Sequence, residues 1–299
     1  MNNILVIGAG PTGSNTAALL ASKGHHVTLV SRRGTPASHP GVRHAAADVN
    51  DPQTMRELAA GVDTLINCAM PAYDRWPEEF PPIGSAALSL AAAVGARLVT
   101  LSNVYGYGPV EGPLRENHAL APHTVKGRVR AGMWDLARRS GVPVAEVRAS
   151  DFLGHASVGY FNLFVLPALL KGEESVFPGD LDAAHSWSFT LDVAATLAAA
   201  ATSQQSWGRA WHVPSCTASV HELATATARL AKLGAPRLRR MTAEELRQAA
   251  EADTMMAEVA EMVYLFERPF LLDASETQRL LGVSATPLEQ VLADNLGPC

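Results

Sequence analysis

A glycine-rich turn near the N-terminus has the residue types and the spacing that hold a phosphate. It reads Gly8-Ala9-Gly10-Pro11-Thr12-Gly13 and matches GxGxxG directly after the apolar run of residues 4–7. In such a turn the first glycine permits the tight bend, the second lets the backbone approach a pyrophosphate, and the third lets the next helix pack closely. The helix that begins there offers free N–H groups and a partial positive charge. We therefore predict that these residues, Pro11 and Thr12 included, bind a dinucleotide.

The end of the second predicted strand bears on which dinucleotide binds. The sequence there reads Val30-Ser31-Arg32-Arg33. Folds specific for NAD usually place an acid at this point to bind the ribose 2′-hydroxyl, whereas guanidinium groups suit the 2′-phosphate of NADP. Because Ser31 takes the place of the acid, we expect Ser31, Arg32 and Arg33 to favour NADP(H) over NAD(H). The alternative is that both arginines are ordinary surface charges beside a site that is empty or holds NAD.

Strands and helices alternate in the first half of the chain. Apolar strands are predicted at 4–7, 27–30, 62–67, 97–101 and 142–148, and helices at 15–23, 52–60, 84–95 and 126–140. This alternation predicts an α/β fold with a doubly wound parallel sheet of the Rossmann kind. The last part looks mainly helical, at 219–233, 242–250 and 254–266. We expect an NADP-binding Rossmann domain from 1–154 with 185–213, and a smaller substrate-binding region from 155–184 with 214–299.

Composition sets the class of protein and excludes several functions. The chain has 299 residues, 47% hydrophobic and 18% charged, and a net charge of −5. Such a chain folds, and without a basic run it is a poor nucleic-acid binder. The three cysteines form no CxxC pair, so we expect neither a metal site nor a disulfide framework. Without an apolar run of about 18 residues or a signal peptide, we expect a cytoplasmic protein with a small-molecule substrate and no membrane partner.

Further segments follow the glycine loop in a recognisable order. They are Asp48-Val49, Asn67-Cys68-Ala69, Ser102-Asn103-Val104-Tyr105-Gly106, Arg148-Ala149-Ser150-Asp151 and Asp192-Val193-Ala194. Together they resemble the short-chain dehydrogenase/reductase superfamily, specifically its NAD(P)-dependent epimerase/dehydratase branch, in an extended or atypical form. The resemblance covers nearly the whole chain. It implies that the following residues contact the cofactor: Asp48, Val49, Cys68, Ala69, Met70, Ser102, Lys126 and Arg148. It also makes a homodimer through the helices at 84–95 and 126–140 possible.

The chain departs from that family at the catalytic pair, Tyr-x-x-x-Lys, which occurs nowhere in the sequence. Our alignment places Thr124 where the family has its tyrosine and Arg128 where it has its lysine. In the family, the tyrosine gives a proton to a substrate oxygen, and the lysine lowers the pKa of the tyrosine and binds the nicotinamide ribose. A threonine hydroxyl is far too weak an acid for this role. Arginine stays cationic, so Arg128 can hold ribose hydroxyls but cannot shuttle protons.

Other side chains are candidates for the missing proton transfer. Tyr105 and Tyr107 follow the strand that ends near Ser102, and Lys126 begins a predicted helix. Asp151 lies just beyond the strand predicted at 142–148. Ser102 could polarise a carbonyl, a desolvated Lys126 could exchange protons, and Asp151 could be a general base. Each has a structural alternative: aromatic packing for the tyrosines, a solvated helix start for Lys126, and a loop hydrogen bond for Asp151.

The expected function is reduction, with NADPH, of a carbonyl or activated double bond in a small and largely apolar metabolite. An apolar substrate pocket could be lined by Tyr73, Trp76 and Phe80, which lie in the loop expected after the strand at 62–67. Core packing explains these residues equally well. The missing tyrosine motivates a second hypothesis, a cofactor-retaining epimerase, isomerase, dehydratase or cyclase. A third hypothesis is an NADP(H)-binding protein without catalysis.

Overall fold

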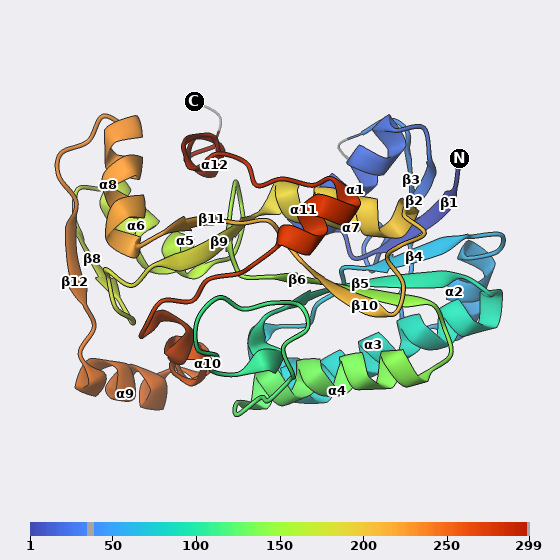
Figure 1. Cartoon of the computed structure of the whole chain (residues 1–299), viewed down its shortest axis with the longest axis horizontal. Helices are drawn as coiled ribbons and strands as arrows, with labels where there is room; N and C mark the ends of the chain where they lie inside the picture. Colours follow the sequence, from blue (N-terminus) through green and yellow to red (C-terminus); the bar gives the residue numbers. More distant parts are fainter. Residues whose placement is uncertain (35–38, 298–299) are drawn as a thin grey trace.

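The computed structural model describes residues 1–34 and 39–297, and a seven-stranded sheet lies at its centre (Figure 1). The strands are β1 (Asn3–Ile7), β2 (His26–Ser31), β3 (Val42–Ala46), β4 (Thr64–Asn67), β5 (Arg97–Asn103), β6 (Val144–Ala149) and β10 (Arg209–His212). Their order is β10-β6-β5-β4-β1-β2-β3, and every neighbouring pair is parallel. The order changes direction between β1 and β4, which is where sheets of this kind bind ligands, at the carboxyl ends of the strands.

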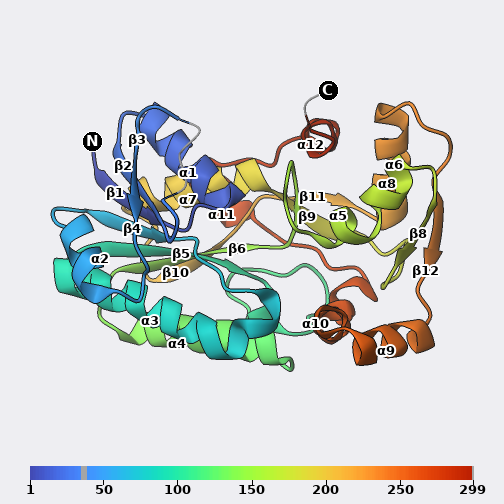
Figure 2. The ribbon, with the colours of Figure 1, turned by 180° about the vertical axis from the view of Figure 1, so that it is seen from behind.

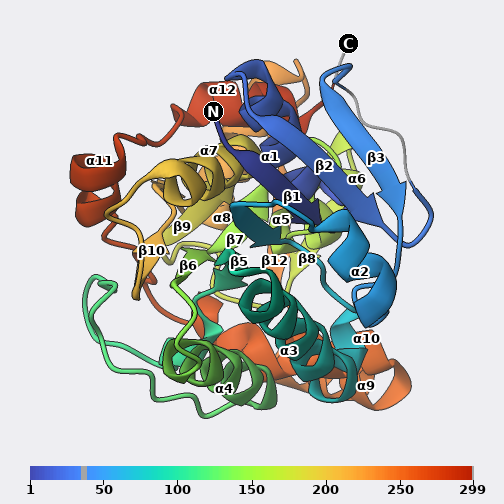
Figure 3. The ribbon, with the colours of Figure 1, turned by 90° about the vertical axis from the view of Figure 1, so that its right-hand side faces the viewer.

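Helices cover both faces of this sheet, as Figure 3 shows from the end of the molecule. One layer contains α1 (Pro11–Ser22), α7 (Thr190–Thr202) and α11 (Ser275–Leu281), and the other contains α2 (Pro52–Leu58), α3 (Trp76–Val94) and α4 (Val125–Arg139). In β1, Ile4 and Val6 pack in the core of the first layer, whereas Leu5 and Ile7 pack in the core of the second. A strand buried on both faces reads as a continuous apolar run. The predicted doubly wound Rossmann fold is confirmed.

Helix α3 begins at Trp76, whereas the sequence predicted a start at Gly84. Pro77 lies in the first turn, where a missing N–H costs no hydrogen bond, but two more prolines, Pro81 and Pro82, lie inside the helix. Trp76 and Phe80 are each 1% exposed, and their ring centroids lie 5.0 Å apart. The burial of these rings outweighs the hydrogen bonds that the prolines cannot donate. Both residues therefore belong to the core under α3 and not to a loop.

The second region has its own apolar core and two small sheets. One sheet contains β7 (Asp151–Leu153), β9 (His185–Phe189) and β11 (Cys216–Ala218), and the other contains β8 (Glu174–Phe177) and β12 (Arg237–Arg240). The helices are α5 (Tyr160–Phe164), α6 (Leu166–Leu170), α8 (Val220–Leu230), α9 (Ala243–Ala252), α10 (Thr254–Met262) and α12 (Leu288–Asn295). Rings of Tyr160, Phe177, Trp187 and Phe266 fill the space between these elements. The region is mainly helical, as predicted, with short strands that the sequence reading omitted.

The two regions interleave along the chain. Strand β9, which lies within the 185–213 segment predicted for the Rossmann domain, pairs with β7 and β11, whereas β10 of the same segment lies at the edge of the main sheet beside β6. Near the C-terminus α11 packs on α7 and β10. The buried carboxylate of Asp192 in α7 accepts hydrogen bonds from the N–H of Thr286 at 2.8 Å and from its hydroxyl at 2.7 Å. Within residues 1–34 and 39–297, no helix is long and apolar enough to cross a membrane.

Candidate active site

The three glycines of the loop after β1 have different surroundings. Gly8 has a φ of +101°, and a Cβ there would lie 2.6 Å from the backbone nitrogen of Ala69. A Cβ on Gly13 would lie 2.0 Å from the carbonyl oxygen of Gly8. A Cβ on Gly10, by contrast, would have no described atom within 4 Å beyond its own stretch of backbone. The protein itself needs the first and third glycines, whereas the second leaves open space beside the backbone, as a bound pyrophosphate requires.

The N-terminus of α1 opens onto this space. Gly10 is its N-cap residue and Pro11 occupies the first turn; among the described residues, no side chain caps the helix. Uncapped N–H groups at a helix N-terminus attract anions, and the helix dipole adds to the attraction. Thr12 and Gly13, which follow, are buried against the sheet. The loop and helix thus fit the diphosphate of a dinucleotide.

The predicted adenosine side lies at the ends of β2 and β3. Arg32 and Arg33 are exposed directly after Ser31, and the N–H of Ala47 donates to the Ser31 carbonyl at 3.1 Å. That bond places Asp48 beside the end of β2. The Asp48 carboxylate is exposed and accepts the N–H of Asn50 at 2.9 Å, while Val49 is buried in the core. The two arginines, Ser31 and Asp48 therefore lie on neighbouring strand ends.

The other side of the glycine loop is formed by residues after β4. The Cys68 and Ala69 backbones touch Gly8, and the Asn67 side chain accepts the N–H of Ala69 at 3.1 Å. Burial raises the pKa of the Cys68 thiol to about 12, so it is a neutral apolar group. Met70 is 57% exposed at the sheet edge. At the end of β5, the buried Ser102 hydroxyl has no hydrogen-bond partner among the described residues, which leaves it available for a ligand.

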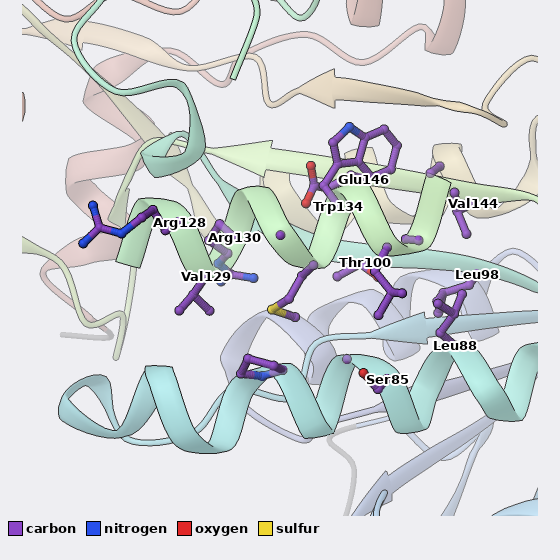
Figure 4. Close-up of a pocket in the computed structure, with 17 residues that line it drawn as sticks. Ser85, Leu88, Leu98, Thr100, Arg128, Val129, Arg130, Trp134, Val144 and Glu146 are labelled. Carbon is purple, nitrogen blue, oxygen red and sulfur yellow. The ribbon is translucent and has the colours of Figure 1, made fainter. Parts of the chain in front are cut away.

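The start of α4 contains the two residues that the alignment places at the catalytic positions. Thr124 is the N-cap residue, and its hydroxyl accepts the N–H of Gly127 at 3.0 Å. Arg128 is exposed and donates to the carbonyl of His123 at 2.9 Å. Figure 4 shows it at the N-terminal end of the helix, with its side chain pointing away from the helix. The buried charged residues of this helix are instead Lys126 and Arg130, which have the same four-residue spacing as a Tyr-x-x-x-Lys pair. Thr124 thus caps the helix and Arg128 lies on its exposed face, whereas Lys126 and Arg130 lie on its buried face.

Arg130 ties α4 to β5 and α3. Its guanidinium donates to the carbonyl of Leu101 at 3.2 Å and lies 4.2 Å from the ring centroid of Phe80 and 4.7 Å from that of Trp76. Burial lowers the pKa of Arg130 to about 10, which still leaves it cationic at neutral pH. Its contacts are with the protein core, so its role is to hold the strand end next to the start of α4.

Lys126 is a buried cation in the first turn of α4. Its side chain is 1% exposed, and Nζ contacts carboxylates of both Glu258 and Glu261 from α10, with a distance of 2.9 Å to Glu261. Nζ also lies 4.5 Å from the ring centroid of Tyr73. Burial lowers the pKa of Lys126, while Glu261 and Asp74 act to raise it. Figure 2 shows α10 next to the ends of α3 and α4.

Three tyrosines and Asp151 form a cluster that reaches this lysine through the Tyr73 ring. The Tyr73 hydroxyl donates to the Tyr105 hydroxyl at 3.3 Å, and the N–H of Tyr160 donates to Asp151 at 2.8 Å. Burial raises the pKa of Asp151 to about 7, against the opposing effect of the hydrogen bonds from the N–H groups of Tyr160 and Phe152. Burial and the nearby Asp151 raise the pKa of Tyr105 to about 12. The cluster therefore holds one carboxyl group that titrates near neutrality among phenols that stay protonated.

Tyr107 and Arg148 are committed to a different, buried network. Arg148 donates to the Tyr107 hydroxyl at 2.6 Å and pairs with Glu146 at 2.6 Å. The Tyr107 hydroxyl also lies 2.8 Å from Nε2 of His212 on β10. Burial raises the pKa of Tyr107 to about 12 and lowers that of His212 to about 3, so both stay neutral. This network joins β6, β10 and the turn after β5, and it gives no support to Tyr107 as proton donor or to Arg148 as cofactor ligand.

A cavity of about 220 Å³ lies between α3 and α4 above the sheet (Figure 4). Leu88 of α3, Met133 of α4, and Thr100 and Glu146 of the sheet are among its lining residues. It contains none of the glycine-loop or tyrosine-cluster residues. The homodimer through these two helices stays a prediction.

The sequence singled out Lys126, Tyr105 and Asp151 as candidates but did not indicate the groups that surround them in the structure. Glu258 and Glu261 lie three residues apart and so share one face of α10. Nothing in the spacing of these two residues indicates Lys126 as their partner, which lies 135 positions from Glu261 in the chain. Tyr160 and Arg130 likewise gave no local signal. A search for metal-binding groups of His, Cys, Asp and Glu found none within residues 1–34 and 39–297.

Comparison with known proteins places the chain in context. The model of the NAD dependent epimerase/dehydratase family matches residues 4–213. No curated protein matches the sequence. Among solved structures, WbmH of Bordetella bronchiseptica in complex with NAD⁺ is 20% identical with a TM-score of 0.76, covering 99% of this chain and 97% of that chain. The UDP-glucuronic acid 4-epimerase of Bacillus cereus in complex with NAD is 16% identical with a TM-score of 0.76, covering 98% and 97%.

A third similar structure is the UDP-glucose 4-epimerase of Thermotoga maritima with UDP-glucose. It is 16% identical with a TM-score of 0.77, covering 98% of this chain and 97% of that chain. At these identities the similarity establishes the fold alone.

The glycine loop yields a matched pair of substitutions. In Gly10→Ala the new methyl group meets open space in the protein, so the melting temperature stays within about 2 °C, the effect of a neutral surface change. The same methyl group occupies the phosphate position, so affinity for NADP(H) or NAD(H) falls at least about tenfold. Gly13→Ala forces a contact with the Gly8 carbonyl and lowers the melting temperature strongly. Thermal unfolding and titration of cofactor fluorescence test both. Wild-type cofactor affinity in Gly10→Ala would overturn this assignment.

Asp151 makes the stability of the protein depend on pH. Between about pH 4 and pH 7 the folded state keeps a proton that the unfolded state has lost, so the stability contributed by the neutral carboxyl is lost as the pH rises through this range. Asp151→Asn cannot ionise. The melting temperature of the variant minus that of wild type is therefore about 2–4 °C larger at pH 8 than at pH 4. Asp135→Asn, in an exposed pair with Arg139, is the control. An Asp151→Asn effect that is the same at both pH values contradicts the prediction.

Proposed function

The chain belongs to the NAD-dependent epimerase/dehydratase family, and on that premise we propose that it is an enzyme that uses a bound nicotinamide cofactor transiently to epimerise or dehydrate a small hydroxylated substrate. The observation that carries the proposal is the cluster at the carboxyl edge of the sheet. There the carboxyl group of Asp151, with a pKa of about 7, lies near Tyr105, whose hydroxyl bonds to that of Tyr73. The buried cation Lys126 contacts the ring of the same Tyr73.

The glycine loop and the N-terminus of α1 are proposed to bind the cofactor diphosphate, with Asp48 on the adenosine side and Ser102 on the nicotinamide side. Gly10 leaves space for the diphosphate, and the buried Ser102 hydroxyl is open to a partner. When bound, the nicotinamide supplies a reversible hydride acceptor. The solved structures of WbmH and of the Bacillus cereus epimerase, described with NAD⁺ and NAD, support a nicotinamide cofactor here.

Lys126 and Asp151 divide the proton chemistry between them. Above about pH 7 the Asp151 carboxylate takes the substrate hydroxyl proton and later returns it. The Lys126 ammonium donates a hydrogen bond to the same oxygen and stabilises the negative charge that develops there. Tyr73 and Tyr105 connect the two groups, because Nζ of Lys126 lies over the Tyr73 ring and the Tyr73 hydroxyl bonds to that of Tyr105.

The substrate proposed is a small, largely apolar metabolite rather than a nucleotide sugar. The similar structures include epimerases described with UDP-glucose and UDP-glucuronic acid, whose diphosphates need cationic partners. In β12 two arginines are paired with acids, Arg239 with Glu174 and Glu245, and Arg240 with Glu267, and the third, Arg237, donates to the carbonyl of Gly172. The site cation Lys126 is paired as well.

A second candidate is the NADPH-dependent reductase, which the two exposed arginines after β2 favour because guanidinium groups suit a 2′-phosphate. The same observation supports NADP(H) over NAD(H) for either reaction. Reductase chemistry consumes NADPH in proportion to product, whereas an epimerase or dehydratase restores its cofactor in each turnover.

The double substitution Arg32→Ala with Arg33→Ala tests the cofactor preference. We expect the dissociation constant for NADPH to rise at least about tenfold, because two charge-assisted contacts to the 2′-phosphate are lost, while that for NADH changes by less than about twofold. Arg56→Ala, an exposed arginine on α2, is the matched control and leaves both constants unchanged. Equal weakening of the two cofactors, or of neither, would show that these arginines do not select NADP(H).

Turnover tests the function itself. The protein is incubated with NADP⁺ or NADPH and a panel of small hydroxy and carbonyl compounds, with product followed by NMR and reduced nicotinamide by absorbance. We expect product without net change in reduced cofactor, and at least about a hundredfold lower rate in Lys126→Met, the size of effect typical for loss of an oxyanion donor. The exposed Lys171→Met is the control. Stoichiometric oxidation of NADPH would favour the reductase, and tight cofactor binding without turnover would contradict both.

A further inference from the structure

We propose that Glu261 of α10 is a positioning residue for Lys126, so that docking of α10 onto the start of α4 creates the cationic donor of the site. The inference rests on the proposed function in giving Lys126 its role towards substrate. Glu258, on the same face of α10, assists Glu261.

The first step is the need for a partner. The Lys126 side chain is 1% exposed, and burial strongly disfavours an unpaired ammonium, so a buried lysine without a counterion loses its proton. The two carboxylates that contact Nζ both come from α10 and remain 28% and 21% exposed. They therefore keep part of their own hydration while they hold the cation in charged form.

The second step is that Glu261 fixes the helix as well as the side chain. One oxygen of Glu261 accepts a hydrogen bond from the Lys126 ammonium, and the other accepts a hydrogen bond from the N–H of Val125 in the first turn of α4. First-turn N–H groups have no partner within their own helix, and Thr124 caps only that of Gly127. One carboxylate thus sets both the start of α4 and the direction in which Lys126 points.

The third step concerns the remaining donor of the ammonium. Nζ has three N–H bonds, and two are accounted for by Glu258 and Glu261. The Tyr73 ring closes one side at 4.5 Å, and its hydroxyl leads to that of Tyr105. A substrate oxygen in the tyrosine cluster is the proposed acceptor for the N–H that the two carboxylates leave over.

The charged and titratable groups around Lys126 make the effect of removing Glu261 predictable in sign. Those that face it are Glu258 and Glu261 of α10 and Tyr73 and Asp74 of the turn η1 (Tyr73–Arg75). Behind Tyr73, its hydroxyl bonds to that of Tyr105 in the turn η2 (Tyr105–Tyr107). Glu261 is the largest influence that favours the charged form, and burial opposes it. Without Glu261 the burial effect is less compensated, and the lysine releases its proton at lower pH.

The experiment uses the full chain labelled with [¹³C,¹⁵N]lysine and needs no substrate. The protein has four lysines, and the other three, Lys23, Lys171 and Lys232, are exposed and act as internal references. NMR titration of the side-chain signals follows each midpoint. In Glu261→Gln we expect the Lys126 midpoint to fall by about one pH unit or more, with the three references unmoved. Glu261→Asp restores part of the shift, and Glu251→Gln, in an exposed pair with Arg247, is the control.

The outcomes separate this inference from the proposed function. If Glu261→Gln fails to fold, Glu258→Gln tests the same pairing and is expected to lower the midpoint as well. An unmoved Lys126 midpoint in a folded variant overturns the inference, even if the wild-type protein turns over a substrate. A shifted midpoint in a protein that turns over nothing upholds the pairing and contradicts the proposed function. With a substrate in hand, the pH profile of kcat/KM in Glu261→Gln is expected to shift by the same amount as the NMR midpoint.

Discussion

The positive charge of Lys126 has to be compensated because it is buried where two halves of the molecule meet. Its side chain begins on α4, beside the main sheet, whereas both of its carboxylate partners come from α10, near the other end of the chain. Removing one partner from a buried ion pair leaves an uncompensated charge, which is strongly destabilising. This requirement fixes α10 against α4 and η1, and it thereby closes the C-terminal region over the carboxyl edge of the sheet.

Two helices begin at that edge, and the structure treats their N-termini in opposite ways. The first turn of α1 has no side-chain cap among the described residues and faces the open space beside Gly10. The first turn of α4 is satisfied by Thr124 and by Glu261. The helix dipole of α1 is therefore left for an incoming anion, while the start of α4 is used to orient Lys126. The proposed cofactor site and the proposed proton chemistry are separated along one sheet edge in this way.

The sequence predicted those parts of the site that depend on local spacing. The glycine loop needs only three glycines between a strand and a helix, and the fold follows from alternating apolar strands and helices. Lys126 and Asp151 stood out because of their places at element ends. What the sequence could not show is tertiary pairing: Glu261 acts on a residue 135 positions away, and Tyr107 and Arg148 are held by His212 and Glu146. The sequence also could not show that Thr124, which the alignment places at a catalytic position, is the N-cap residue of α4.

The central claim is that a nicotinamide cofactor lies along this edge with its reactive end beside Lys126. An experimental structure of the protein with NADP⁺ bound tests it most directly. We expect the diphosphate against Gly10 and the N-terminus of α1, the nicotinamide next to the Ser102 hydroxyl, and the Lys126 ammonium still paired with Glu261. A cofactor bound with its nicotinamide away from Ser102, or a Lys126 that has left Glu261 and turned to solvent, would contradict the claim.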